Sequence, residues 1–180
     1  MHSSLIRQLF TRRLIACEVV VCLFASGLVV QAQDASQDSA QLRRVQKLSD
    51  QLRTKLEIAE PVQVTIVPTN RLLFSVEPVE QGSRGAFRLN VEEEFVEGLS
   101  DAELIAAVAH ELGHVWIFTH HPFLQTEQLA NDIAMRLVSR EALAQLYEQV
   151  WSRRGTKGDL ARFLGPQPQA GLASSDATAP

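Results

Sequence analysis

The sequence predicts one α+β domain: an N-terminal helix, a small sheet and two further helices in chain order. Three observations support this. Apolar residues recur at helical spacing in the first third of the chain, three short runs with strand composition follow, and two long helical stretches come last. The chain has 180 residues, of which 46% are apolar, so one modest core can form once the two ends are set aside.

Residues 1–32 have the features of a signal peptide or an N-terminal anchor. Three arginines precede the apolar run from Leu14 to Val30, and small residues follow where a signal peptidase cuts. Glu18 leaves a clean apolar stretch that is short for a membrane-spanning helix. We therefore expect a secreted or periplasmic protein, or one anchored to a membrane through this segment, with the domain outside the cytoplasm in each case.

Cysteine usage and charge exclude several classes of function. Both cysteines, Cys17 and Cys22, lie in the leader. The rest of the chain therefore offers no cysteine nucleophile, no disulfide framework and no cysteine-rich zinc site. The formal net charge is −4, and no basic patch indicates a nucleic-acid partner.

The first half of the domain, which we place at residues 41–164, begins after a polar linker at 33–40. An amphipathic helix runs from Leu42 to Leu56 and ends before Pro61. Three strands are then predicted, the third of them half-exposed because its apolar and polar residues alternate. They cover Val62 to Val67, Leu72 to Val76 and Phe87 to Val91.

Two long helices are predicted in the second half. Ser100 and Glu103 have the spacing of a capping box, so one helix begins there and continues to about Phe118. Another covers roughly Leu124 to Val150. The tail at 165–180 is rich in Pro, Ala, Ser and Gln and is expected to be disordered. The expected buried face of the second helix consists of Leu129, Ile133, Leu137, Leu143 and Leu146.

The first of these helices carries His110-Glu111-Leu112-Gly113-His114, an HExxH motif. Residues four apart share a helix face, so His110 and His114 can both coordinate one metal ion, for which Zn²⁺ is the expected cofactor. Glu111 lies close enough to act as a general base. It would take a proton from water whose pKa zinc has lowered to about 7 and pass it to the leaving amine.

A catalytic zinc usually has a third protein ligand, and two residues are candidates. Glu127 lies on the following helix, where Ala130 and Ala134 share its face and allow close packing at Gly113. Asn131 would then hydrogen-bond a ligand histidine and select its tautomer.

The alternative third ligand is His120, six residues after His114, which matches the spacing of the three-histidine metzincin pattern. That pattern has a glycine where this chain has Ile117, and a β-branched residue resists the sharp break that the helix would need. We favour Glu127. His120 and His121 would then be loop residues at the rim of the cleft, or a donor to the developing oxyanion.

The stretch from Asp101 to Ala109 that leads into the HExxH motif, followed by Glu127, Ala130 and Asn131, resembles the gluzincin metallopeptidases. The likeness covers roughly Ala86 to Arg140 and is greatest to the CAAX prenyl endopeptidases and HtpX-like proteases. It implies a minimal zincin-like domain with Glu127 as third ligand. That family usually has aspartate where this chain has Asn131; asparagine is similar to the IrrE-like and ImmA-like metallopeptidase domains.

The resemblance also implies that an edge strand above the active-site helix binds the substrate backbone as an added strand. The segment Arg84 to Val91 is the candidate for it. The acidic run that follows, with Glu92, Glu93, Glu94 and Glu97, either biases the cleft toward basic peptides or forms a solvated turn or short helix.

The sequence thus predicts a zinc metalloendopeptidase, a hydrolase of peptide or protein substrates, with His110, His114 and Glu127 as ligands and Glu111 as base. The alternative from another class is a non-catalytic, zinc-stabilised interaction or assembly module of the cell envelope with the same fold. His120 or His121 as an additional ligand would close the metal site and produce it.

Overall fold

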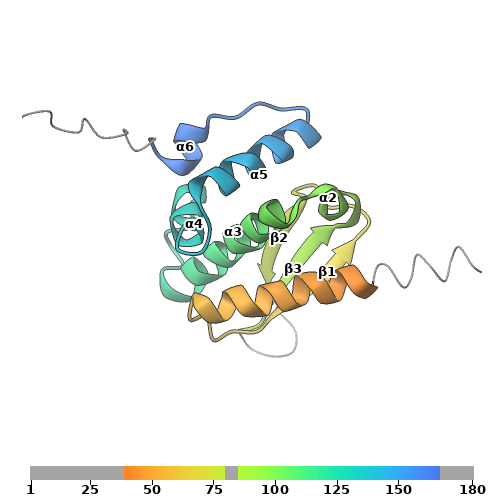
Figure 1. Ribbon diagram of the computed structural model, residues 1–180. Coiled ribbons are helices and arrows are strands. Elements are labelled where there is room, and N and C mark those ends of the chain that lie inside the picture. The colour runs from red at the N-terminus through yellow and green to blue at the C-terminus, as the bar shows by residue number, and fades with distance from the viewer. Residues whose placement is uncertain (1–38, 80–84, 167–180) are drawn as a thin grey trace, which may run out of the picture. The chain divides into compact units, whose positions relative to one another are not determined.

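The computed structural model describes residues 39–79 and 85–166 (Figure 1). By its internal contacts the chain divides into Met1–Arg44 and Val45–Pro180. The predicted leader at 1–32 lies outside the described residues, as does all but the start of the predicted tail. The second unit is an α+β domain with a three-stranded mixed sheet, as the sequence predicts.

The N-terminal helix covers residues 39–55 in the described part of the chain, so it already includes two residues assigned above to the linker. Its residues Val45 and Leu52 are buried and Leu48 is partly buried, whereas Lys47, Asp50 and Lys55 are exposed. The Gln46 amide also hydrogen-bonds both the carbonyl of Val62 and the N–H of Val64. The helix therefore attaches to the first strand through both apolar packing and hydrogen bonds.

The sheet has the strand order β1-β3-β2. Strand β1 (Val62–Val67) runs parallel to β3 (Phe87–Glu92), and β2 (Phe74–Pro78) runs antiparallel to β3 on its other side. The first strand matches its predicted bounds, β3 ends one residue later than predicted, and β2 begins and ends two residues later. β3 is the central strand.

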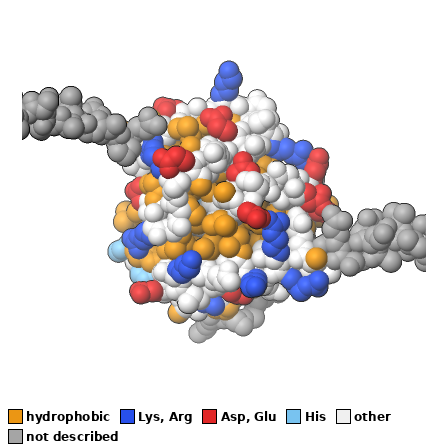
Figure 2. Space-filling view, viewed as in Figure 1, with side chains coloured by type: hydrophobic (Ala, Val, Ile, Leu, Met, Phe, Trp, Pro, Cys, Tyr) orange, Lys and Arg blue, Asp and Glu red, His pale blue; other side chains and the backbone are white. Residues whose placement is uncertain are grey.

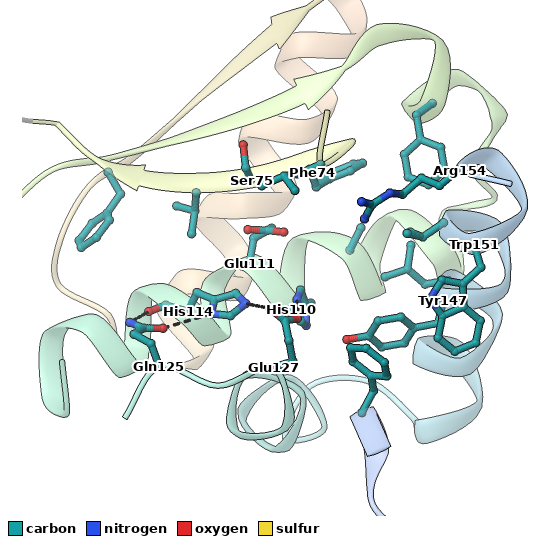
Figure 3. Close-up of a pocket in the computed structure, with 18 of the residues that line it drawn as sticks. Phe74, Ser75, His110, Glu111, His114, Gln125, Glu127, Tyr147, Trp151 and Arg154 are labelled. Carbon is teal, nitrogen blue, oxygen red and sulfur yellow. Dashed lines mark hydrogen bonds and ion pairs between the residues drawn. The ribbon is translucent and has the colours of Figure 1, made fainter. Parts of the chain in front are cut away.

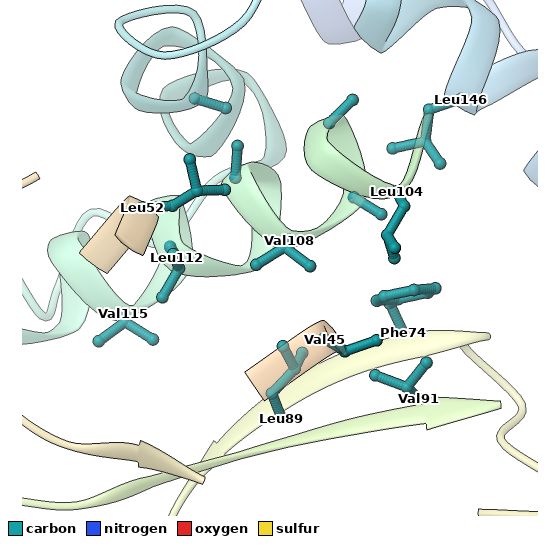
Figure 4. Packing of buried hydrophobic residues seen from close by; sticks show 14 of the residues in the cluster. Val45, Leu52, Phe74, Leu89, Val91, Leu104, Val108, Leu112, Val115 and Leu146 are labelled. Atoms are coloured by element: carbon teal, nitrogen blue, oxygen red, sulfur yellow. The ribbon is translucent and has the colours of Figure 1, made fainter. Parts of the chain in front are cut away.

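One face of the sheet is buried, because apolar residues alternate with polar ones along each strand. In β3 the side chains of Phe87, Leu89 and Val91 are at most 3% exposed, while Arg88 and Asn90 lie on the other face. The third strand is thus half-exposed, as predicted. The N-terminal helix and the long helix α3 cover the apolar face (Figure 4).

Helix α3 (Asp101–His120) begins with the predicted capping box. The Ser100 hydroxyl accepts from the Glu103 N–H, and the Glu103 carboxylate accepts from the Ser100 N–H. The helix then packs Leu104, Val108 and Leu112 toward the sheet (Figure 4). Its remaining face is free to carry the HExxH residues toward the C-terminal helices.

The second long helix is a wrong prediction, because the chain forms two helices there. Helix α4 (Glu127–Ala134) and helix α5 (Arg140–Arg153) are separated by a turn. The Ser139 hydroxyl accepts from the Ala142 N–H and caps a new helix, which the uninterrupted apolar spacing conceals. A short helix α6 (Leu160–Leu164) follows, and helix α2 (Glu93–Gly98) connects β3 to α3.

The surface shown in Figure 2 is mixed in character. Hydrophobic side chains gather between α5 and the N-terminal helix, and side chains of both charges surround them. Within residues 39–79 and 85–166, no helix is long and apolar enough to cross a membrane.

Candidate metal centre

Two helices bring together the three residues named as metal ligands. His110 and His114 project from one face of α3, and Glu127 is the first residue of α4, where the Thr126 hydroxyl caps the helix by accepting from the Leu129 N–H. Among the described residues, this trio is the one group of three or more His, Cys, Asp or Glu side chains close enough to hold a metal ion.

The distances in this trio fit a tetrahedral metal site. Glu127 Oε2 lies 3.2 Å from His110 Nε2, and Glu127 Oε1 lies 3.6 Å from His114 Nε2. Donor atoms about 2.1 Å from a tetrahedral zinc ion are separated by about 3.4 Å. Both measured separations are close to this value, and the three candidate donor atoms all lie within 4.8 Å of one another, so the group could hold a metal ion.

The far nitrogen of each histidine is held by a carboxamide. His110 Nδ1 lies 2.8 Å from Asn131 Oδ1, and His114 Nδ1 lies 3.2 Å from Gln125 Oε1. An amide oxygen only accepts, so each Nδ1 carries a proton, and each Nε2 is the ring atom that faces Glu127 and could coordinate a metal ion (Figure 3). The predicted contact of Asn131 with one of the two motif histidines is confirmed, and that histidine is His110.

Asn131 is fully buried and satisfies groups from two other helices. Its amide nitrogen donates to the Tyr147 hydroxyl at 2.8 Å and to the Phe163 carbonyl at 2.9 Å. An aspartate would present an oxygen to the Phe163 carbonyl, and two acceptors repel each other. The contacts in this fold thus favour asparagine over aspartate at this position.

The Asn131→Ala variant is expected to bind zinc about 10- to 100-fold more weakly, because His110 loses the acceptor that orients it. Competition with a chromophoric zinc chelator measures this change. His120→Ala is the matched control and should keep the affinity of the unsubstituted protein. Equal zinc affinities of the two variants would contradict this role for Asn131.

Helix α4 approaches α3 closely at Gly113, as the sequence predicts. A Cβ at this position would lie 2.4 Å from the carbonyl oxygen of Ala130 and 3.0 Å from its Cα. Glycine therefore permits the backbone contact that brings Glu127 to the two histidines.

Glu111 lies beside the trio without joining it. Its side chain points toward β2, and the residue is 8% exposed (Figure 3). Burial raises the pKa of Glu111, while the two neighbouring histidines and a hydrogen bond from the Val76 backbone oppose that rise. A carboxylate with a raised pKa accepts a proton more readily than an ordinary one, which suits a general base.

The hydrogen bonds and charges within the trio shift the pKa values of Glu127 and His114 in opposite directions. Hydrogen bonds from His110 and His114 hold the pKa of Glu127 far below its ordinary value, against the effect of burial. Burial lowers the pKa of His114, but the hydrogen bond to Glu127 and the charge of Glu111 more than compensate, so it is raised overall. Glu127 is thus ionised, as a metal ligand must be.

His120 does not join the candidate metal centre. Helix α3 continues through it, and its ring stacks on Trp116 with 4.2 Å between ring centroids and 7° between ring planes. His120 Nδ1 lies 2.9 Å from the Trp116 carbonyl oxygen. His121 follows as the cap residue of the helix, so the structure groups neither residue with the two ligand histidines.

The trio opens into a cavity of about 590 Å³. Strand β2 forms one wall and α5 another, with Glu111 and the trio between them (Figure 3). The four acids of the run, Glu92, Glu93, Glu94 and Glu97, do not line this cavity; residues Glu93–Gly98 form α2, and Glu92 and Glu94 contact Arg153. Of the two alternatives for this run, the short helix is the one that the structure shows.

Several residues of the site have no signal in the sequence. Gln125, Tyr147 and Arg154 all line the cavity, and none has a motif-like spacing from the HExxH residues. Tyr147 is the one tyrosine of the chain. Burial raises its pKa, so its hydroxyl stays protonated at neutral pH.

Comparisons of the chain with protein-family models, with curated proteins and with solved structures found no match.

Proposed function

We propose that this protein is a zinc-dependent endopeptidase with a minimal zincin-like fold of the gluzincin type. The observation that carries the proposal is the convergence of His110, His114 and Glu127 at tetrahedral distances beside the buried Glu111. All four residues line one cavity that is bordered by an edge strand.

Zinc is the metal that best suits these donors. Two imidazoles and one carboxylate form a ligand set used by catalytic zinc sites, which keep another position for water or substrate. The Glu127 side chain is 53% exposed, so the site is accessible from solvent. This supports a site that admits substrate.

The residues of the chain account for the proton transfers of peptide hydrolysis. Bound zinc supplies the acidity of the attacking water and polarises the scissile carbonyl. Glu111 accepts the proton of the attacking water and delivers it to the departing amine nitrogen. Asn131 and Gln125 keep the two imidazoles in the tautomer that coordinates the metal.

In this proposal the substrate backbone pairs with β2. The segment Arg84 to Val91, which is the candidate from sequence, is not the strand that binds it. That segment contains β3, whose two edges already pair with β1 and β2. Strand β2 pairs on one side within the described part of the chain, and its other edge borders the cavity. An extended peptide added there would lie over Glu111.

The rival function is a non-catalytic module in which zinc is structural. It requires a fourth protein ligand, and the described residues supply three. The cavity and the exposure of Glu127 favour the peptidase. Export through the segment at 1–32, with activity outside the cytoplasm, remains part of the proposal.

Metal removal tests the function. The purified protein is expected to contain a single zinc ion and to hydrolyse quenched-fluorescent peptides. Dialysis against a chelator should abolish hydrolysis, and added zinc should restore it, because the metal supplies the attacking water's acidity. A protein that holds a single zinc ion but cleaves no member of a diverse peptide library would instead support the structural module.

A further inference from the structure

Helix α5 lines the cavity with a row of side chains that leads away from the metal ligands. Leu146, Val150 and Arg154 are spaced four residues apart and therefore share one helix face, and Tyr147 and Trp151 lie beside them. Tyr147 contacts Asn131 next to the metal ligands. Arg154 comes seven residues later, about 10 Å further along the helix axis.

The two arginines at the end of α5 have different surroundings. Arg153 bonds the Glu94 carboxylate and lies 3.7 Å from Glu92. Arg154 points into the cavity (Figure 3), and among the described residues its guanidinium has no hydrogen bond or ion pair. A guanidinium has five N–H donors suited to a carboxylate, so Arg154 presents an unused anion-binding group to whatever enters the cavity.

The walls between Arg154 and the metal ligands are apolar. Phe74 from β2 and Phe95 from α2 make an edge-to-face contact at 5.9 Å and lie across the cavity from α5. Trp151 is held in place at Gly158, where a Cβ would lie 1.9 Å from its ring. This part of the cavity therefore suits a bulky apolar side chain.

The free edge of β2 gives the direction of a bound peptide. The Val79 N–H and the Leu73 carbonyl both bond to β3 at 2.8 Å, so alternation turns the backbone groups of Phe74, Val76 and Pro78 toward the cavity. The Val76 N–H bonds Glu111, which leaves the Phe74 N–H and the carbonyls of this edge for a peptide. In Figure 3, β2 runs from the end near Arg154 toward the end near Gln125. A peptide in the more stable antiparallel pairing runs the opposite way, so its residues after the scissile bond lie near Arg154.

We propose that Arg154 selects substrates that carry a carboxylate within about three residues after the scissile bond, next to a bulky apolar side chain. The inference rests on the proposed function and specifies its substrate class. The carboxylate is either that of an aspartate or glutamate side chain or the terminal carboxylate of a short peptide, since both offer the same pair of oxygens to the guanidinium.

Peptide binding tests the proposal without relying on hydrolysis. The probes are acetylated peptides with one phenylalanine. Glutamate, glutamine or lysine is placed at each of the three positions after it in turn, and each peptide is made with a free and with an amidated C-terminus. Their affinities are measured by calorimetry on the zinc-loaded Glu111→Gln protein, alone and with Arg154→Gln, Arg154→Glu or Arg162→Gln added. Arg162 is an exposed arginine outside the cavity lining and serves as the matched control.

We expect peptides with a carboxylate to bind about tenfold more tightly than their neutral counterparts, which is the effect of a charge-assisted pair. Arg154→Gln should abolish this difference, Arg154→Glu should reverse it in favour of lysine-containing peptides, and Arg162→Gln should leave it unchanged. Comparing the amidated glutamate peptides with the glutamine peptides that have a free C-terminus identifies which carboxylate Arg154 binds.

Two outcomes separate this inference from the proposed function. If the unsubstituted protein cleaves glutamate and glutamine peptides equally, and Arg154→Gln does not change their affinities, the role of Arg154 is wrong while the peptidase stands. If carboxylate peptides bind through Arg154 but none is cleaved, the peptidase is wrong and Arg154 remains the recognition residue.

Discussion

The Glu111→Gln variant is expected to bind zinc normally and to hydrolyse peptides about 10²- to 10⁴-fold more slowly, mainly through kcat. Glutamine has the size of glutamate but cannot take a proton from water. The proposed metal ligands His110, His114 and Glu127 are unchanged, so zinc content should stay the same. Progress curves on a quenched-fluorescent peptide, with zinc measured in the same sample, provide the readout.

The same variant is expected to unfold at an equal or higher temperature in the presence of a chelator. Burial raises the pKa of Glu111, so at neutral pH the folded state bears the cost of a buried charge that a neutral amide lacks. Glu148→Gln, at an exposed position on α5, is the matched control and should alter neither property. Full hydrolysis by Glu111→Gln would contradict the proposed mechanism.

The Gly113→Ala variant is expected to lower the free energy of unfolding by about 1–3 kcal/mol, as overpacking of a buried contact does. The added Cβ would lie 2.4 Å from the Ala130 carbonyl oxygen, which is backbone and moves only with α4. Because α4 carries Glu127 and Asn131, its displacement should also weaken zinc binding at least about tenfold. Urea titrations with and without zinc measure both effects.

Gly98→Ala is the matched control for this substitution. A Cβ at Gly98 would meet nothing within 4 Å, so alanine should be neutral or slightly stabilising there. If the two variants unfold at the same urea concentration and bind zinc equally, the close approach of α3 and α4 does not hold the ligands together.

Local patterns were sufficient to predict the elements that depend on neighbouring residues. The capping box at Ser100 and Glu103, and the alternation along β1 and β3, involve residues a few positions apart. The helical spacing of His110 and His114 likewise sets their common face before any packing is known. The contact of Asn131 with His110 was predicted because it follows from placing Glu127 on the facing helix.

Features that depend on distant parts of the chain could not be predicted. The strand order places β3 between β1 and β2, and no single-strand pattern distinguishes a central strand from an edge strand of a half-exposed sheet. The break between α4 and α5 at Ser139 has no signal in the sequence, because the apolar spacing continues across it. The break changes the direction of the chain and brings Tyr147 of α5 into contact with Asn131, beside the candidate metal centre. Arg154 joins the cavity through the same change of direction.

The edge of β2 that borders the cavity also bears on self-association. An open strand edge that can receive one extended peptide can equally receive the edge of another copy, which is how sheets grow into aggregates. Strand β2 is only five residues long, and Pro78 at its end has no N–H to offer a neighbour. So short an edge can form the few hydrogen bonds that a transiently bound peptide needs. It offers too few for stable pairing between two copies of the protein.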